Sequence, residues 1–207
     1  MLNQYNKIAH FYTGLSRLVF GNQLHNIQQE LIRHLPTDGK LLILGGGNGK
    51  ILPSIFKHAP HLSIEYVEAS SSMIKLAKKN APNHQKITFH HIDVIDYSHK
   101  HGHIYAGFFL DLFHEKQIEQ LIRKLEKPKQ TTWYIADFQI NKNTRNHLFR
   151  SIQLKSTILF FRLTTQHTIN YLPNIRSVFL NLGYYPMSET NDYSFVFKEI
   201  FRIQFKN

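Results

Sequence analysis

The feature that most constrains the fold is a run of glycines between a short apolar segment and a helical pattern. Residues 41–44, Leu-Leu-Ile-Leu, form a continuous apolar run that is typical of a strand buried in a parallel sheet. Gly45, Gly46, Gly47 and Gly49 follow at once, so four of the chain's 10 glycines fall within five residues. Glycine lets the backbone turn tightly and approach a ligand closely. The helix that follows also offers free N–H groups to a carboxylate or a phosphate.

Strands and helices alternate along the chain on both sides of this loop. Strands are predicted at 41–44, 63–67, 87–92, 103–110 and 131–138, and helices at 23–35, 51–58, 70–79, 116–125, 144–165 and 174–182. This alternation predicts βαβ units and a parallel sheet with right-handed crossovers. Two further strands, 184–189 and 194–205, are too close for a helical crossover and predict an antiparallel hairpin at the sheet edge. We therefore predict one α/β domain: a Rossmann-like, doubly wound, seven-stranded, mostly parallel sheet (40–207) behind an N-terminal helical cap (1–39).

A carboxylate follows the glycine loop at a distance that suits a ribose. The dinucleotide fingerprint G-x-G-x-x-G is incomplete because Lys50 takes the place of its third glycine, and the P-loop pattern is missing. Glu68 lies 19 residues beyond Gly49, close to the roughly 20-residue offset at which an acidic side chain binds ribose hydroxyls. A ligand-free turn and a solvated strand end are the alternatives. Loop and acid together favour a nucleoside-containing ligand.

These segments resemble the class I S-adenosylmethionine-dependent methyltransferases. Residues 41–49, LLILGGGNG, are similar to the family's first motif, V-L-D-x-G-x-G-x-G. Residues 67–74, VEASSSMI, are similar to its second-strand acid with the D-x-S-x-x-M-L pattern, and residues 90–94, HHIDV, to its third-strand acid. The resemblance spans about residues 40–140 and implies S-adenosylmethionine (SAM) as cofactor and S-adenosylhomocysteine (SAH) as product. Ile43 departs from the family, which has at this position an Asp that helps to hold the ammonium group of the cofactor.

The resemblance also assigns roles to single residues. It implies that Glu68 binds the ribose hydroxyls, that Ser70 and Met73 flank the adenine, and that Asp93 and the Val94 backbone fix the adenine edge. Ser70 also suits a helix N-cap, and Met73 also suits a core-facing position. The cofactor-binding residues expected on this basis are Gly45, Gly46, Gly47, Gly49, Glu68, Ala69, Ser70, Met73, Asp93, Val94 and Tyr12.

The N-terminal segment resembles a narrower group within the family. Residues 5–12, YNKIAHFY, are similar to the opening of methyltransferases related to quinone biosynthesis, in which an aromatic side chain closes over the cofactor and the substrate. Tyr5 and Tyr12 are the matching positions. Aromatic packing within the helical cap is the alternative.

The loop after the fourth strand should face the transferred methyl group, because ligands bind beyond the carboxyl ends of the strands. It reads FFLDLFHE over residues 108–115 and lacks the N/D-P-P-Y/F motif of amine methylation. The chain has no cysteine, which excludes a thiolate mechanism, and no metal is expected. Transfer to oxygen or carbon needs only a base or proximity. His114 is the candidate base and Asp111 the candidate orienting acid, although one of 14 histidines could fall here by chance and Asp111 also suits an N-cap.

The charge of the chain raises a second functional hypothesis. Net charge is +11, and residues 140–207 hold 9 basic and 3 acidic residues, or +6 of that total. An RNA methyltransferase or RNA-binding protein is therefore the alternative, and a non-catalytic cofactor-binding protein is a third. The opening segment, the aromatic loop after the fourth strand and the missing amine motif favour a small aromatic or lipophilic acceptor. Because the charge excess is densest outside the cofactor motifs, peripheral membrane contact is possible and nucleic acid is not expected. The lack of a long apolar run favours a cytoplasmic protein.

Overall fold

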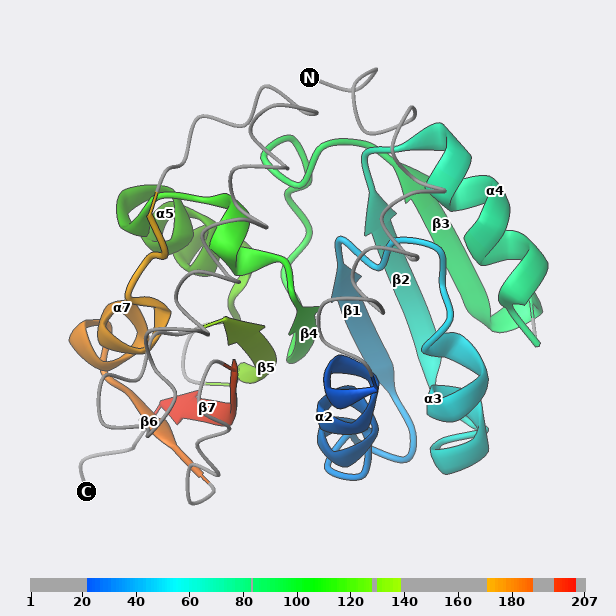
Figure 1. The fold of residues 1–207 in the computed structure, drawn as a ribbon, viewed down its shortest axis with the longest axis horizontal. Coiled ribbons are helices and arrows are strands. Elements are labelled where there is room, and N and C mark those ends of the chain that lie inside the picture. The colour runs from blue at the N-terminus through cyan, green and yellow to red at the C-terminus, as the bar shows by residue number, and fades with distance from the viewer. Residues whose placement is uncertain (1–21, 83, 128–129, 139–170, 188–195, 204–207) are drawn as a thin grey trace.

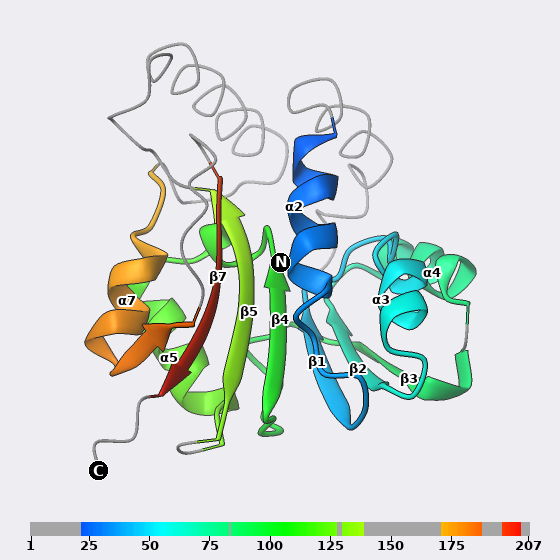
Figure 2. The same cartoon turned by 90° about the horizontal axis from the view of Figure 1, so that it is seen from below.

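A seven-stranded sheet with helices on both faces forms the body of the protein in a computed structural model (Figures 1 and 2). The structure describes residues 22–82, 84–127, 130–138, 171–187 and 196–203. The strands are β1 (Lys40–Leu44), β2 (Ser63–Glu68), β3 (Ile87–His91), β4 (His103–Gly107), β5 (Thr132–Phe138), β6 (Tyr184–Pro186) and β7 (Val196–Ile203). Their order is β3-β2-β1-β4-β5-β7-β6, with β7 antiparallel to both neighbours and the other pairs parallel. The predicted Rossmann-like sheet and its antiparallel hairpin are confirmed.

Each face of the sheet is covered by helices that bury one apolar side. The helices are α2 (Gln23–Ile32), α3 (Leu52–His58), α4 (Ser71–Asn80), α5 (Glu115–Leu125) and α7 (Ile175–Asn181). The first three share one hydrophobic cluster with the sheet, and α5 and α7 share a second cluster on the opposite face (Figure 2). In α5 the buried residues recur at helical spacing, at Ile118, Leu121, Ile122 and Leu125. Among the described helices, none is long and apolar enough to cross a membrane.

Two sequence predictions differ from the structure or lie outside it. The strand predicted over 103–110 ends at Gly107, because Phe108 adopts a left-handed backbone with φ of 55° and the chain enters a short 3-10 helix, η3 (Leu110–Leu112). The backbone N–H of Phe108 donates to the carbonyl of Ala136 at 2.7 Å, which holds this turn against β5. The helix predicted at 144–165 and most of the helical cap lie outside the described residues.

One row of side chains runs across the sheet on the face covered by α2, α3 and α4. The strand register places Phe89, Tyr66, Ile43, Tyr105, Tyr134 and Ile200 side by side from β3 to β7. Ile43 is fully buried in the middle of this row. The position that carries an Asp in the resembled family is therefore part of the hydrophobic core in this chain.

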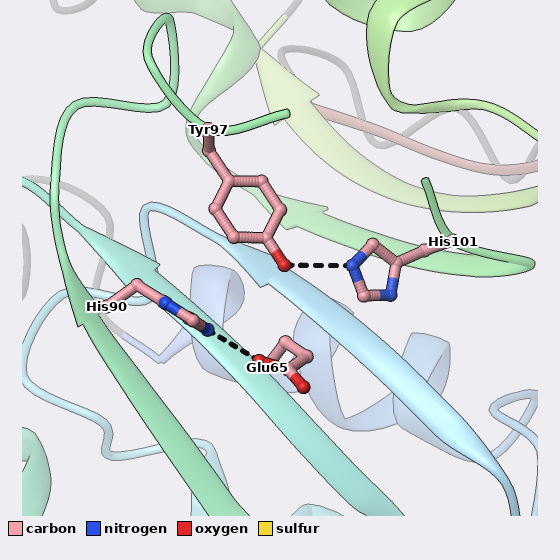
Figure 3. A network of polar contacts seen from close by, with 4 residues as sticks. All are labelled: Glu65, His90, Tyr97 and His101. Atoms are coloured by element: carbon pink, nitrogen blue, oxygen red, sulfur yellow. Dashed lines mark hydrogen bonds and ion pairs between the residues drawn. The ribbon is translucent and has the colours of Figure 1, made fainter. Parts of the chain in front are cut away.

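The opposite face of β2 and β3 carries a polar network instead of a helix. The connection from β3 to β4 forms no helix, and Tyr97 within it packs its ring edge-on to His90, with 5.2 Å between ring centroids. His90 Nε2 lies 2.5 Å from Glu65 Oε2, and the Tyr97 hydroxyl lies 2.9 Å from His101 Nε2 (Figure 3). These contacts fill the space over two strands with paired polar groups.

His101 makes a pH-dependent contribution to stability. Burial lowers its pKa from 6.5 to about 4, so the folded protein keeps the ring neutral. Between these values the unfolded chain binds the proton and the folded chain does not, so stability falls as the pH drops from about 6.5 to about 4. The free energy of unfolding should fall by at most about 1.4 kcal/mol per pH unit across this window. Urea unfolding of His101→Gln across this pH window should show a correspondingly flatter profile.

A matched variant separates this effect from general titration. His61→Gln removes an exposed histidine that is not among the groups acting on the pKa of His101, and it should keep the wild-type pH profile. A His101→Gln profile parallel to that of the wild type would contradict the assignment.

Candidate active site

The glycine loop is tied to the carboxyl end of β2 by two hydrogen bonds that loop N–H groups donate. The Gly45 N–H donates to the Val67 carbonyl at 2.9 Å, and the Gly47 N–H donates to Glu68 Oε2 at 3.0 Å. The other carboxylate oxygen of Glu68 accepts the Ser70 N–H at 2.8 Å. The structure therefore brings together the loop, the acid and the start of α4, as the sequence motifs imply.

Gly47 and Gly49 share a left-handed backbone but differ in what surrounds them. Gly47 and Gly49 both have positive φ, at 61° and 72°, which disfavours any residue with a side chain. A Cβ on Gly49 would lie 2.7 Å from the Ala77 Cα, so this glycine permits the close approach of α4. A Cβ on Gly47 would meet no atom of the described residues within 4 Å. The open side of the loop is thus at Gly47, next to the Glu68 carboxylate.

The residues around Glu68 fit the ribose of SAM. Burial raises the pKa of Glu68, and backbone N–H donors, foremost those of Ser70 and Gly47, partly offset this. A carboxylate can accept about four hydrogen bonds, so Glu68 retains acceptor capacity beyond these contacts. Hydroxyl donors reaching a buried carboxylate would form charge-assisted hydrogen bonds. The Gly47 N–H that Glu68 accepts lies beside the free Cβ position of the loop, so a ligand placed there would adjoin this carboxylate.

The residues expected around the adenine lie near the same edge of the sheet. Ser70 caps α4 by accepting the Met73 N–H at 3.3 Å, so the alternative N-cap role is observed. Met73 is half-buried and belongs to neither hydrophobic cluster, which speaks against the core-facing alternative, and Ala69 is half-buried as well. Asp93 is half-buried after β3 and accepts the N–H two residues further on at 3.1 Å. Val94 is 4% exposed and its side chain is buried within the second cluster, which leaves only its backbone for the contact that the resemblance implies.

Tyr66 supports the glycine loop and was not among the site residues that the sequence motifs imply. Its hydroxyl donates to the Gly47 carbonyl at 2.9 Å, and its ring lies where a Cβ on Gly46 would stand, 2.3 Å away. Tyr66 lies on β2, directly beside Ile43 of β1. Its spacing of two residues from Glu68 on the same strand is the only sequence signal that places it on the same face as that acid.

His114 belongs to a relay of polar side chains at the start of α5. Its Nδ1 lies 3.2 Å from the Tyr171 hydroxyl, which donates to Glu115 Oε2 at 2.5 Å. The other Glu115 oxygen accepts the Asn174 N–H at 3.1 Å, which ties the segment before α7 to the start of α5. Tyr171 was not expected at this site, because it is 57 residues away from His114 in the sequence.

Asp111 is oriented away from this relay and pairs with another acid. Asp137, at the end of β5, accepts the N–H groups of Leu110 at 2.9 Å and Asp111 at 3.3 Å. Burial raises the pKa of Asp111 to about 6 and raises that of Asp137, whose neighbouring acid adds to the shift. Among the described residues no hydrogen bond joins Asp111 to His114. The turn at Phe108 into η3 directs Asp111 toward β5, so Tyr171 takes the place beside His114 that Asp111 was expected to occupy.

Two other expectations concern metals and the N-terminus. In the described ranges, no three His, Asp or Glu side chains are grouped so that they could hold a metal ion. Tyr5 and Tyr12 lie outside the described residues.

The fold is similar to that of several solved methyltransferases. An O-methyltransferase family protein from Burkholderia thailandensis matches all of this chain with a TM-score of 0.69 and 15% identity, and the match covers 64% of that protein. DhpI in its complex with SAH matches 98% of the chain with a TM-score of 0.69 and 12% identity, over 94% of its own length. Magnesium protoporphyrin IX methyltransferase from Synechocystis PCC 6803, with bound SAH, matches 94% with a TM-score of 0.62 and 13% identity, over 88% of its length.

These likenesses show that the chain has the class I methyltransferase fold. The chain spans just under two thirds of the Burkholderia protein, but nearly the whole of DhpI. The family model described as the spermine/spermidine synthase domain matches residues 25–102, which run from α2 to the start of β4 and include the glycine loop and Glu68. A sequence comparison with curated proteins gives no match.

Proposed function

We propose that the protein is a SAM-dependent methyltransferase that acts on oxygen or carbon of a small aromatic or lipophilic molecule. The observation that carries this proposal is the half-buried Glu68 carboxylate, held by the Gly47 and Ser70 N–H groups beside the open side of the loop. When bound, SAM supplies a methyl group on a positively charged sulfur. Glu68 would hold the ribose, and Asp93 with the Val94 backbone would hold the adenine edge.

The residues after β4 support an acceptor that loses a proton. The half-buried rings of Phe108 and Phe109 follow the strand end, and the Phe109 ring packs directly against Gly45. If His114 donates from Nδ1 to the Tyr171 oxygen, its Nε2 is left as an acceptor. Such an imidazole suits the removal of a proton from a phenol or an enol. Nearby aromatic rings suit a flat, lipophilic acceptor.

Binding of SAM and SAH by isothermal calorimetry tests the core of the proposal. We expect one site that binds both, and SAH release with phenolic or enolic acceptors. A protein that binds neither compound would refute the proposal.

The net charge of +11 keeps an RNA methyltransferase or RNA-binding protein as the second candidate. Salt-sensitive retention on RNA, with a slope set by released counterions, would favour that candidate instead.

Replacement of His114 by alanine should slow methyl transfer and leave cofactor binding intact. A positioned general base contributes about 10²- to 10⁴-fold to a proton-transfer step, so turnover should fall by that order while SAH affinity stays at the wild-type level. Tyr171→Phe, which breaks the relay but keeps the imidazole, should cause a smaller loss. His61→Ala removes an exposed histidine at the start of β2 and serves as control. Unchanged turnover of His114→Ala would exclude a role for this side chain as the base.

A further inference from the structure

A buried tyrosine hydroxyl near the glycine loop has no hydrogen-bond partner. Tyr105 on β4 is 1% exposed, and its hydroxyl makes no hydrogen bond among the described residues. Burial raises its pKa, so the hydroxyl stays protonated and neutral. Buried polar groups are nearly always paired in folded proteins, because an unpaired buried hydroxyl lowers stability. An unpaired hydroxyl inside a rigid sheet therefore calls for a partner that the described residues do not supply.

The hydroxyl points toward the edge of the sheet that carries the loop. A Cβ on Gly107 would lie 2.7 Å from the Tyr105 oxygen and 3.0 Å from the Gln28 amide nitrogen, so both polar groups converge on the last residue of β4. The register pairs Leu44 with Ala106, which sets Gly107 beside Gly45, the first loop glycine. In Figure 2, α2, which carries Gln28, stands over this part of the sheet.

In the resembled family an Asp stands at position 43 and helps to hold the ammonium group of the cofactor. Ile43 is the direct neighbour of Tyr105 across β1 and β4, and it is fully buried. An isoleucine offers no acceptor to an ammonium group. Strands β1 and β4 also flank the point where the strand order reverses, and in sheets of this kind ligands bind outside the carboxyl ends of the strands there. Tyr66 and Tyr105 flank position 43 on the two neighbouring strands, and of these two hydroxyls that of Tyr105 is the one without a partner among the described residues.

We propose that the Tyr105 hydroxyl receives the α-ammonium group of the SAM methionine part in place of an Asp at position 43. The proposal rests on the proposed function and extends it by one ligand contact. A tyrosine oxygen has two lone pairs and accepts from an ammonium group while remaining neutral. The exchange of a carboxylate for a neutral hydroxyl keeps the contact and removes a charge from the core.

Calorimetry with two ligands on two proteins isolates this contact. Wild type and Tyr105→Phe are titrated with SAH and with its desamino analogue, which lacks only the α-amino group. A hydrogen bond to a charged group predicts a loss of about 10- to 100-fold in SAH affinity for Tyr105→Phe, and no loss for the desamino analogue. The melting temperature of unliganded Tyr105→Phe should equal or exceed that of the wild type, because the variant removes an unpaired buried hydroxyl.

Tyr134→Phe is the matched control. Tyr134 lies next to Tyr105 in the same row, but its hydroxyl pairs with His103 Nδ1 at 3.2 Å, at the opposite end of β4. This variant should leave both affinities unchanged. An equal loss for both ligands in Tyr105→Phe, or no loss for SAH, would overturn the ammonium assignment and leave the proposed function standing. A wild-type protein that binds neither ligand would overturn both.

Discussion

Replacement of Glu68 by glutamine is expected to weaken SAH binding by about 30- to 1,000-fold. Two ribose hydroxyls donating to a buried carboxylate are worth about 2–4 kcal/mol together, because hydrogen bonds to charged groups are stronger than neutral ones. Glutamine keeps one oxygen and puts an NH2 group where the second oxygen accepts a backbone N–H, so it loses charge and acceptor capacity at once. Calorimetry with SAH, together with a melting curve to verify folding, measures the effect.

Glu65→Gln is the matched control for this experiment. Glu65 lies on the same strand but on the opposite face, where it contacts His90, so its loss should leave SAH affinity unchanged (Figure 3). The pH dependence gives a second check. Because burial raises the pKa of Glu68, SAH affinity should fall in acid as this carboxylate takes up a proton, and Glu68→Gln should not show that fall. Equal affinities for Glu68→Gln and the wild type would contradict the ribose assignment.

Replacement of Gly49 by alanine should be the most destabilising change in the loop. A left-handed backbone costs a non-glycine residue about 1–2 kcal/mol, and the new methyl group would stand 2.7 Å from the Ala77 Cα of α4. Backbone cannot move aside as a flexible side chain can, and overpacking adds about 1–3 kcal/mol. The free energy of unfolding should therefore fall by about 2–5 kcal/mol, which corresponds to roughly 5–20 °C in melting temperature.

Two other glycines separate the parts of this effect. Gly39 has φ of 84° and free space around it, so Gly39→Ala carries the backbone cost alone, about 1–2 kcal/mol. Gly47→Ala should cost stability to the same extent, but its methyl group enters the open space beside Glu68 and should lower SAH affinity as well. A Gly49→Ala variant no less stable than Gly39→Ala would show that α4 can shift away from the loop.

The local parts of the site could be predicted from the sequence because each of them depends on a few consecutive residues. The apolar run of β1, the glycines after it and the acid at the end of β2 lie within 28 residues, 41–68, and each has a pattern of its own. The Ser70 N-cap is equally local, and the structure confirms it. The boundary of β4 was not predictable in this way, since Phe108 turns left-handed in response to its contact with β5.

The long-range parts of the site depend on which side chains the sheet brings together. The sequence by itself determined a doubly wound sheet with a glycine loop and a carboxylate at one edge, because hydrophobic periodicity and glycine placement act over a few residues. Only the tertiary structure decided that Tyr66 braces the loop, that Asp111 pairs with Asp137 and that Tyr171 reaches His114. These pairings depend on strand register and on the direction of each side chain, and neither is encoded within a short segment. The position of the unpaired Tyr105 hydroxyl also depends on strand register, because the register sets Tyr105 directly beside position 43.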